Sequence, residues 1–266
     1  MSSQTLPNVS PPKTRPLELD MILGSLGQEL SRLEENILSD IRTDVELLNT
    51  VAEHILLSGG KRLRPALVML GASFFSSVDD SIRRAAQVVE YLHTGTLLHD
   101  DVVDGAETRR ARKAARRIWG NEASVLTGDY LLSKAFHMLT ELRNLEVLRL
   151  MSRTTTLMAK GEILQLKCSI GEVDEKEYLN IIFHKTACLF GSAAQSGALL
   201  AGASSEEAEC LRRYGEALGM AFQIVDDALD YEESPQTGKQ AGTDFLERKI
   251  TMPLIHLIRN ANERDR

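Results

Sequence analysis

The sequence predicts an all-α fold, and three observations support this prediction. Four of the seven prolines fall within the first sixteen residues, so residues 17–266 contain only three. Because proline interrupts helices, such sparse proline permits long ones. Apolar residues recur at three- and four-residue spacing, which is typical of one buried helical face. No segment shows the sustained alternation of apolar and polar residues that is typical of a half-buried strand.

The chain divides into a short N-terminal tail and one large domain. Residues 1–16 are rich in Pro, Ser and Thr, and we expect them to be disordered. Residues 17–266 are expected to form one domain, because 43% of the chain is hydrophobic, which suffices for a large core.

Helical patterns follow one another along this domain. The first is an apolar face that includes Leu19, Leu26 and Ile37. Further helices are predicted at Val45–Leu57, Pro65–Phe75, Ile82–Val103, Ala123–Leu142, Glu146–Leu166, Tyr178–Leu200, Ala208–Leu229 and Met252–Ile258. Glycines at turns, such as Gly59-Gly60 and Gly105, separate them. The expected architecture is a bundle of about ten helices.

Charge and hydropathy exclude some classes of protein. The formal net charge of -7 argues against a general binder of nucleic acid or anionic membranes. No apolar stretch reaches the roughly 18 residues that span a bilayer, and the N-terminus lacks a signal-peptide pattern. The sequence therefore predicts a cytoplasmic protein with no stable membrane insertion.

A DDxxD motif occurs twice, each time at the end of an apolar helical run. The first comprises Asp100, Asp101 and Asp104, and the second comprises Asp226, Asp227 and Asp230. On a helix, residues four apart share a face and lie about 6 Å apart along the axis. Asp100 therefore pairs with Asp104, and Asp226 pairs with Asp230.

One acidic cluster of this kind is most often a solvated helix end, but two matched copies favour a shared function. Mg²⁺ binds one or two carboxylates and completes its shell with water and substrate phosphates. The helical surface before the first motif is small at Gly95 and Thr96 and then apolar, which suits a slender channel for a hydrocarbon tail. Plain helix packing through small residues explains the same pattern.

Basic residues that suit an anion follow the glycine pair. Lys61 and Arg64 lie where the next helix begins, and Pro65 suits its first position. Exposed N–H groups at a helix N-terminus bind anions. Basic loops are common, so this signal is weak by itself.

Two further basic features lie beside the acidic motifs. Residues 109–117 contain six cations in nine residues, which fits a diphosphate clamp or a nucleic-acid patch. Lys185 has apolar helical neighbours, and a buried ammonium needs an anionic partner. A structural salt bridge or a lysine that extends to solvent is nearly as good an interpretation.

The order of the motifs resembles that of the trans-isoprenyl diphosphate synthases, and most closely the bacterial polyprenyl (octaprenyl-type) members. The segments that carry the resemblance are GGKRLRP, LLHDDVVD, GNEASVLTGDY, HKT, FQIVDDALDY and GKQAGTDFLERKITMP. It extends from about Leu19 to the end of the chain, and the paired DDxxD motif in this context is highly specific.

The resemblance implies an all-α isoprenoid synthase (prenyltransferase) helical bundle around a central cavity, usually as a homodimer. The implied Mg²⁺ ligands are Asp100, Asp104, Asp226 and Asp230. The implied contacts to isopentenyl diphosphate are Lys61, Arg64, His93 and Arg110. The implied contacts to the allylic diphosphate are Arg109, Lys185, Thr186, Gln223 and Lys239, of which Lys185, Thr186 and Gln223 also have a catalytic role.

The implied reaction is ionisation of the allylic diphosphate, attack by the double bond of isopentenyl diphosphate, and loss of a proton. Gly95 and Thr96 imply an open channel and a medium- or long-chain product. Alternatives are a short-chain (farnesyl or geranylgeranyl) synthase or a non-catalytic synthase subunit. A class I terpene cyclase shares only the first motif, and a nucleic-acid-binding module conflicts with the net acidity.

The chain departs from the family pattern in two places. Relatives usually follow the arginine pair with a Gly-Lys-Pro/Ala-Thr stretch, whereas residues 111–114 read Ala-Arg-Lys-Ala. Only thirteen residues follow Pro253, whereas relatives continue through further helices. The resemblance therefore implies a catalytic domain that is shortened at its C-terminus.

Overall fold

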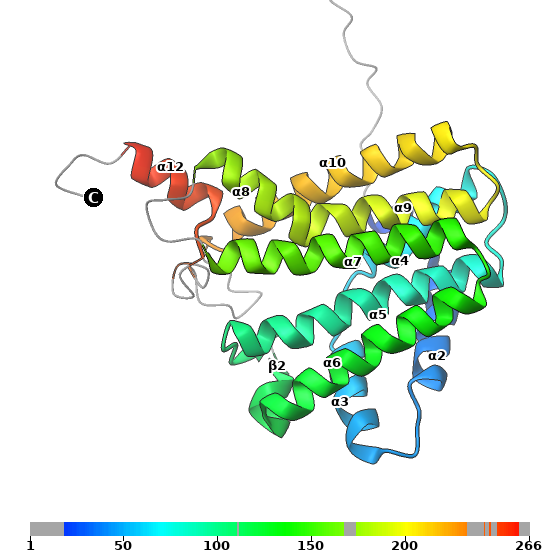
Figure 1. The fold of residues 1–266 in the computed structure, drawn as a ribbon, viewed down its shortest axis with the longest axis horizontal. Coiled ribbons are helices and arrows are strands. Elements are labelled where there is room, and N and C mark those ends of the chain that lie inside the picture. The colour runs from blue at the N-terminus through cyan, green and yellow to red at the C-terminus, as the bar shows by residue number, and fades with distance from the viewer. Residues whose placement is uncertain are drawn as a thin grey trace, which may run out of the picture.

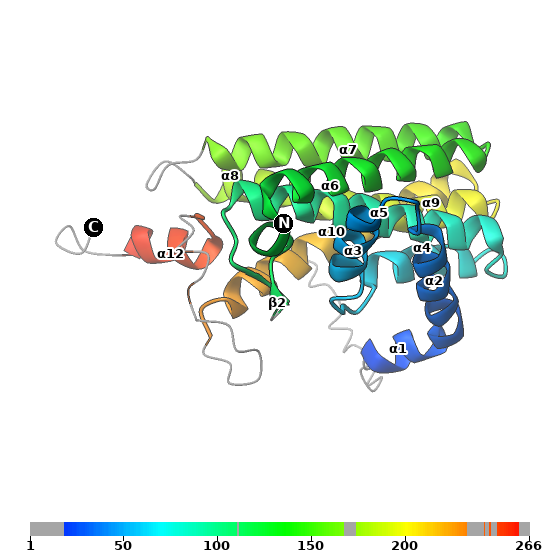
Figure 2. The ribbon, with the colours of Figure 1, turned by 90° about the horizontal axis from the view of Figure 1, so that it is seen from below.

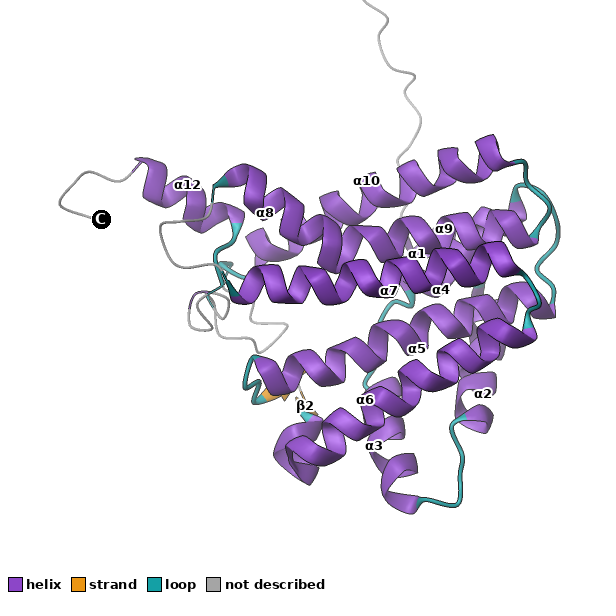
Figure 3. Cartoon of the chain, viewed as in Figure 1, coloured by secondary structure: helices purple, strands orange, loops and turns teal. Residues whose placement is uncertain are grey.

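The computed structural model describes residues 19–110, 112–167, 174–232, 242, 245 and 249–260. The predicted tail at residues 1–16 and the predicted ligand-contacting residue Lys239 lie outside these ranges. In the part of the chain that is described, nearly all regular structure is helical (Figure 3). The predicted all-α fold is confirmed.

The helices follow the predicted order with small shifts at most ends. They are α1 (Leu19–Ser25), α2 (Gly27–Asp40), α3 (Glu46–Leu56), α4 (Leu63–Ser73), α5 (Asp80–Val103), α6 (Ala115–Glu141), α7 (Leu145–Leu166), α8 (Glu175–Ile182), the π-helix η1 (Phe183–Ala187), α9 (Cys188–Leu200), α10 (Ser205–Leu229) and α12 (Met252–Asn260). However, α6 begins at Ala115 rather than Ala123 and has non-helical backbone angles at Gly120. Polar side chains begin several of them. The Asp79 carboxylate accepts the Ile82 N–H at 3.0 Å before α5, and Ser204 and Glu207 form a capping box before α10.

The long helices α5, α6, α7, α9 and α10 run along the long axis of the molecule, and α2 and α3 cross one side of them (Figures 1 and 2). Helix α9 is buried along most of its length and packs against α4, α7 and α10. Glycine permits this close packing. A Cβ on Gly197 would lie only 1.9 Å from the Val68 carbonyl oxygen, and one on Gly215 would lie 2.6 Å from that of Phe190.

Four further local features differ from the sequence expectation. The first predicted helix is broken at Leu26, whose φ/ψ angles are not helical, and α2 begins at Gly27. The predicted helix Tyr178–Leu200 is interrupted by η1. Pro65 is the third rather than the first residue of α4, although it still lies in the first turn. Residues 108–109 and 112–113 form a two-stranded antiparallel hairpin, β1 (Thr108–Arg109) and β2 (Arg112–Lys113), which has too few residues for any pattern to reveal.

Among the described residues, none of the helices is both long enough and apolar enough to cross a membrane.

Candidate active site

The two DDxxD motifs lie at the C-terminal ends of α5 and α10. Asp104 and Asp230 are the first residues beyond these helices, and both keep right-handed helical backbone angles. They therefore stay on the same face as Asp100 and Asp226. Both helix ends lie at the same end of the bundle, on the left of Figure 1.

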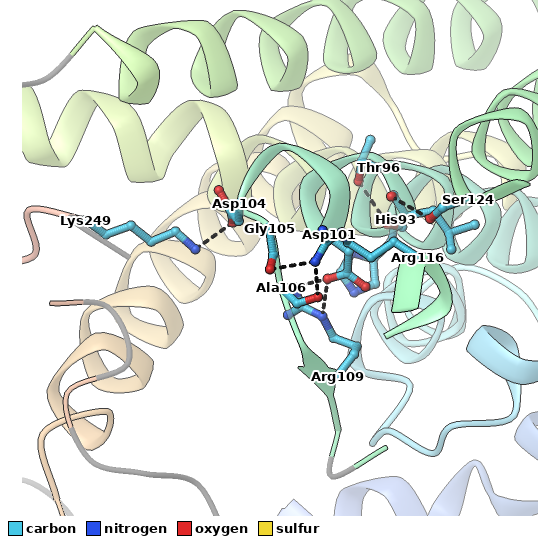
Figure 4. Close-up of polar contacts among 11 residues, drawn as sticks. His93, Thr96, Asp101, Asp104, Gly105, Ala106, Arg109, Arg116, Ser124 and Lys249 are labelled. Carbon is cyan, nitrogen blue, oxygen red and sulfur yellow. Dashed lines mark hydrogen bonds and ion pairs between the residues drawn. The ribbon is translucent and has the colours of Figure 1, made fainter. Parts of the chain in front are cut away.

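The middle aspartate of each motif is turned into the protein. Asp101 is 0% exposed and accepts hydrogen bonds from Arg109 Nε at 2.8 Å and Nη2 at 2.5 Å (Figure 4). Asp227 is 5% exposed and accepts hydrogen bonds from the Tyr178 hydroxyl at 2.7 Å and the Gln223 side-chain amide at 2.6 Å. Burial raises the pKa of both carboxyls, and the bonded donors oppose this shift. These bonds turn the middle aspartate of each motif away from the helical face that the first and third aspartates share.

Asp100 lies in a strongly acidic environment. Burial, followed by repulsion from the Glu162 carboxylate on α7, raises the pKa of Asp100 to about 7, whereas Lys185 and Arg109 act to lower it. Asp104 also repels it and forms an ion pair of 2.7 Å with Lys249 (Figure 4). A divalent cation placed here would favour the ionised form of Asp100.

Two adjacent residues of the π-helix η1 contact side chains that lie near the two motifs. Lys185 Nζ forms an ion pair of 2.9 Å with Glu162 and donates a hydrogen bond to Gln165. The next residue, Thr186, donates its hydroxyl proton to Gln223 Oε1 at 2.7 Å, and Gln223 in turn binds Asp227. The predicted anionic partner of Lys185 is therefore Glu162. Single-turn π-helices occur often at functional sites.

A second basic site is built around Arg64 on α4 and His93 on α5. Arg64 Nη1 is 3.1 Å from His93 Nε2, and the guanidinium lies 4.7 Å from the centre of the Phe190 ring. Burial lowers the pKa of Arg64 to about 10, and burial and Arg64 hold the pKa of His93 well below its usual value. His93 is therefore neutral and accepts from Arg64. Arg64 Nε is buried without a hydrogen-bond partner, so this site has unused capacity for an anion.

The hairpin of β1 and β2 carries the two arginines of the predicted clamp in opposite directions. Arg109 turns toward Asp101, whereas Arg110 has a φ of +50° and donates to the Gly59 carbonyl oxygen. A positive φ is uncommon for arginine and costs free energy, so this conformation indicates a constrained turn. Lys61, the other predicted contact on this side, is exposed.

Two further cations of the six in residues 109–117 bind the protein itself. Arg116 donates to the carbonyl oxygens of Gly105 at 2.7 Å and Ala106 at 2.9 Å (Figure 4), and Arg117 forms an ion pair of 2.7 Å with Glu107. These two arginines stabilise the loop between α5 and α6. The sequence could not reveal this, because a charge run does not show which members bind backbone oxygens.

The interpretation of Gly95 as a channel residue is also not supported. A Cβ on Gly95 would lie 3.0 Å from Leu132 Cγ and 3.1 Å from the Gly128 carbonyl oxygen, both on α6. Gly95 therefore permits α5 and α6 to approach closely, which is the alternative of plain helix packing. Thr96 is half-buried and donates to the His93 carbonyl oxygen at 2.9 Å (Figure 4).

Three residues near the motifs were missed in the sequence. Glu162 and Gln165 are polar residues three apart on a mostly apolar stretch of α7, and this spacing was the available signal. Lys249 lies 145 residues from Asp104 in the sequence and forms an ion pair with it. No local pattern could have indicated that contact.

The donor set suits a hard divalent cation. No group of three or more His, Cys, Asp or Glu side chains in the described part of the chain is arranged to hold a metal by itself. The first and third aspartates of the motifs offer carboxylate oxygens only, and the negative charge around Asp100 would be relieved by a cation. This fits Mg²⁺, which uses few protein oxygens and takes others from water and phosphates.

Comparison with known proteins gives concordant matches. A family described as polyprenyl synthetase matches residues 45–266. The octaprenyl diphosphate synthase of Escherichia coli (strain K12) is 40% identical over 242 residues, which cover 90% of this chain and 75% of that protein. The all-trans-nonaprenyl-diphosphate synthase (geranyl-diphosphate specific) of Rhodobacter capsulatus is 39% identical over 250 residues, covering 92% and 76%.

A solved structure is similar over most of the chain. It is a polyprenyl synthase from Caulobacter crescentus CB15, crystallised in complex with calcium and isoprenyl diphosphate. The TM-score is 0.89 at 39% sequence identity, and the match covers 94% of this chain and 77% of that one.

Proposed function

Because this chain belongs to the polyprenyl synthetase family, we propose that it joins isopentenyl diphosphate head to tail to an allylic diphosphate, with Mg²⁺, to make a medium- or long-chain trans-polyprenyl diphosphate. The predicted class of enzyme, a prenyltransferase, is confirmed by the family match. The octaprenyl and nonaprenyl products named for two relatives support the longer chain.

The observation that carries the residue assignment is the position of η1. The charge of Lys185 lowers the pKa of Asp100 in the first motif, and Lys185 forms an ion pair with Glu162. Thr186 donates a hydrogen bond to Gln223, which binds Asp227 of the second motif. The two acidic motifs therefore border one region, as a shared ligand requires. This supports Asp100, Asp104, Asp226 and Asp230 as the Mg²⁺ ligands.

On this proposal, the chain's own groups bind the allylic diphosphate around that region. Arg109, Lys185 and Lys239 contact it, and their positive charge stabilises the negative charge that develops as the carbon–oxygen bond breaks. When bound, Mg²⁺ would neutralise further charge on the same diphosphate. The oxygens of Thr186 and Gln223 face the allylic cation that forms.

Isopentenyl diphosphate is assigned to the second basic site. The partnerless Nε of Arg64 supports a diphosphate there, together with His93, Lys61 and Arg110. A neutral His93 keeps one more positive charge out of this crowded site, because Arg64 and Arg110 already repel each other. The double bond attacks the allylic cation, and the proton then leaves, on this proposal to the departed diphosphate.

Three further parts of the assignment stay predictions. They are the homodimer, the cytoplasmic location and the role of Lys239. The division of the chain at residue 17 is likewise a prediction, made from its composition.

The test is an assay with isopentenyl diphosphate and allylic diphosphates of several lengths, with Mg²⁺ or with EDTA, followed by analysis of product length. We expect Mg²⁺-dependent products of medium or long chain. Farnesyl or geranylgeranyl products alone would show a short-chain synthase. Binding of both diphosphates without any product would show a non-catalytic subunit, and cyclised hydrocarbons would show a terpene cyclase.

A further inference from the structure

We propose that His184 is a positioning residue for the allylic diphosphate, because its ring holds the π-helix that directs Lys185 toward α7 and Thr186 toward α10. The inference rests on the proposed function of these two residues. His184 is the first residue of the HKT segment and directly precedes Lys185 and Thr186.

The ring of His184 binds the backbone at the point where the helix changes its hydrogen-bond register. His184 is 7% exposed, and its Nδ1 lies 2.7 Å from the Asn180 carbonyl oxygen. A carbonyl oxygen can only accept, so Nδ1 carries the proton. Four residues after His184, the Cys188 N–H binds the Phe183 carbonyl oxygen, an i→i−5 bond that is characteristic of a π-helix. The imidazole thus supplies a donor to a carbonyl group at the start of the irregular turn.

The π-helix packs closely against α7 at His184. A Cβ on Gly161 would lie 2.8 Å from His184 Cβ and 2.9 Å from the Lys185 backbone nitrogen. The backbones of α7 and η1 therefore pack directly on each other at Gly161. The next residue on α7 is Glu162, which binds Lys185 at 2.9 Å.

A π-helix is needed because its two functional residues serve different neighbours. One residue of register on an α-helix corresponds to about 100° of rotation and 1.5 Å of rise. If the turn relaxed to α-helical register, Lys185 and Thr186 could not both keep their contacts, one with Glu162 on α7 and the other with Gln223 on α10. The part-buried bond from His184 to Asn180 opposes that relaxation, since losing it would remove one donor from the Asn180 carbonyl oxygen.

The experiment compares His184→Leu, which removes the donor, with His184→Asn, whose amide nitrogen is as far from Cβ as Nδ1 is. KM is measured separately for the allylic diphosphate and for isopentenyl diphosphate. We expect His184→Leu to raise KM for the allylic diphosphate about tenfold, as for loss of one buried hydrogen bond. KM for isopentenyl diphosphate should change less than twofold, because Arg64 and His93 lie on other helices. His184→Asn should recover most of the loss.

KM does not depend on the concentration of folded enzyme, so a general loss of stability would not reproduce this split. The matched controls are His137→Leu and His137→Asn, since the His137 side chain is 74% exposed on α6. Both controls should leave both KM values unchanged. Equal rises in both KM values for His184→Leu, or no recovery by His184→Asn, would overturn the proposal.

A measurement that needs no turnover separates this inference from the proposed function. In ¹H–¹⁵N spectra of histidine-labelled wild-type protein, the ring of His184 should carry a proton on Nδ1. A ring without a proton on Nδ1 would overturn the inference even in an active enzyme. A wild-type protein that shows Nδ1–H but makes no product would instead contradict the proposed function.

Discussion

The ends of α5 and α10 carry the same pattern, DDxxD, in different surroundings. At the end of α5, Asp101 is bound by the cation Arg109, and Asp104 is bound by Lys249. At the end of α10, the buried Asp227 is bound by neutral donors from Tyr178 and Gln223. The comparison teaches that one motif can be held in place by charge and the other by neutral hydrogen bonds, although the same role as Mg²⁺ ligands is proposed for the first and third aspartates of both.

The largest expected effect tests that shared task. Asp100→Asn and Asp226→Asn should each lower kcat by about 10³-fold or more, because both remove a proposed Mg²⁺ ligand. Their effects on the metal-free protein should differ. Asp100 is half-buried and repelled by Glu162, so Asp100→Asn should raise the free energy of unfolding, whereas Asp226 is exposed and its substitution should leave it unchanged. Activity assays and urea unfolding in EDTA measure both effects, and near-normal turnover in either variant would refute the metal assignment.

Substitution of the middle aspartates, Asp101 and Asp227, should change the free energy of unfolding by different amounts. Asp101→Asn leaves Arg109 without its buried anion and should lower the free energy of unfolding by about 2–3 kcal/mol, less than for a fully buried pair because Arg109 is partly exposed. Asp227→Asn keeps one acceptor oxygen and should cost about 1–2 kcal/mol. Chemical unfolding at equal pH compares them. If Asp227→Asn is the more costly, the distinction between charged and neutral support is wrong.

The glycines before each motif offer a third comparison. A Cβ on Gly219 would lie 2.6 Å from the Ala187 Cα, whereas one on Gly95 would lie 3.0 Å from Leu132 Cγ and 3.1 Å from the Gly128 carbonyl oxygen. Gly219→Ala should therefore cost about 1–3 kcal/mol. Gly95→Ala should cost less, because its contacts require smaller shifts and the gain in helix propensity offsets part of the cost. Thermal unfolding tests the order, and an unchanged product length in Gly95→Ala would agree with a packing role.

The smallest effect concerns the ion pair between Lys249 and Asp104. Both side chains are partly exposed, at 21% and 18%, so Lys249→Met should lower the free energy of unfolding by no more than about 1 kcal/mol. The difference should shrink at high salt. Urea unfolding at two salt concentrations measures it, and a loss that does not depend on salt would argue against an electrostatic contact.

Much of the fold followed from local patterns. The helices around the motifs were predicted with ends within a few residues of those observed, because apolar periodicity and the glycine turns are local signals. The pairing of Asp100 with Asp104 followed from helical spacing alone. The break at Leu26 and the interruption at η1 were missed, since packing rather than propensity decides such irregular turns.

The sequence by itself determined the fold class, the two acidic motifs and the need of Lys185 for an anion, because spacing on a helix is a local property. Only the tertiary structure decided that Glu162 is that anion, that Gly95 packs on α6, and that Arg116 binds loop carbonyls rather than a ligand. These contacts join segments far apart in the chain or a side chain to backbone oxygens. They depend on how the helices pack, which no local pattern encodes.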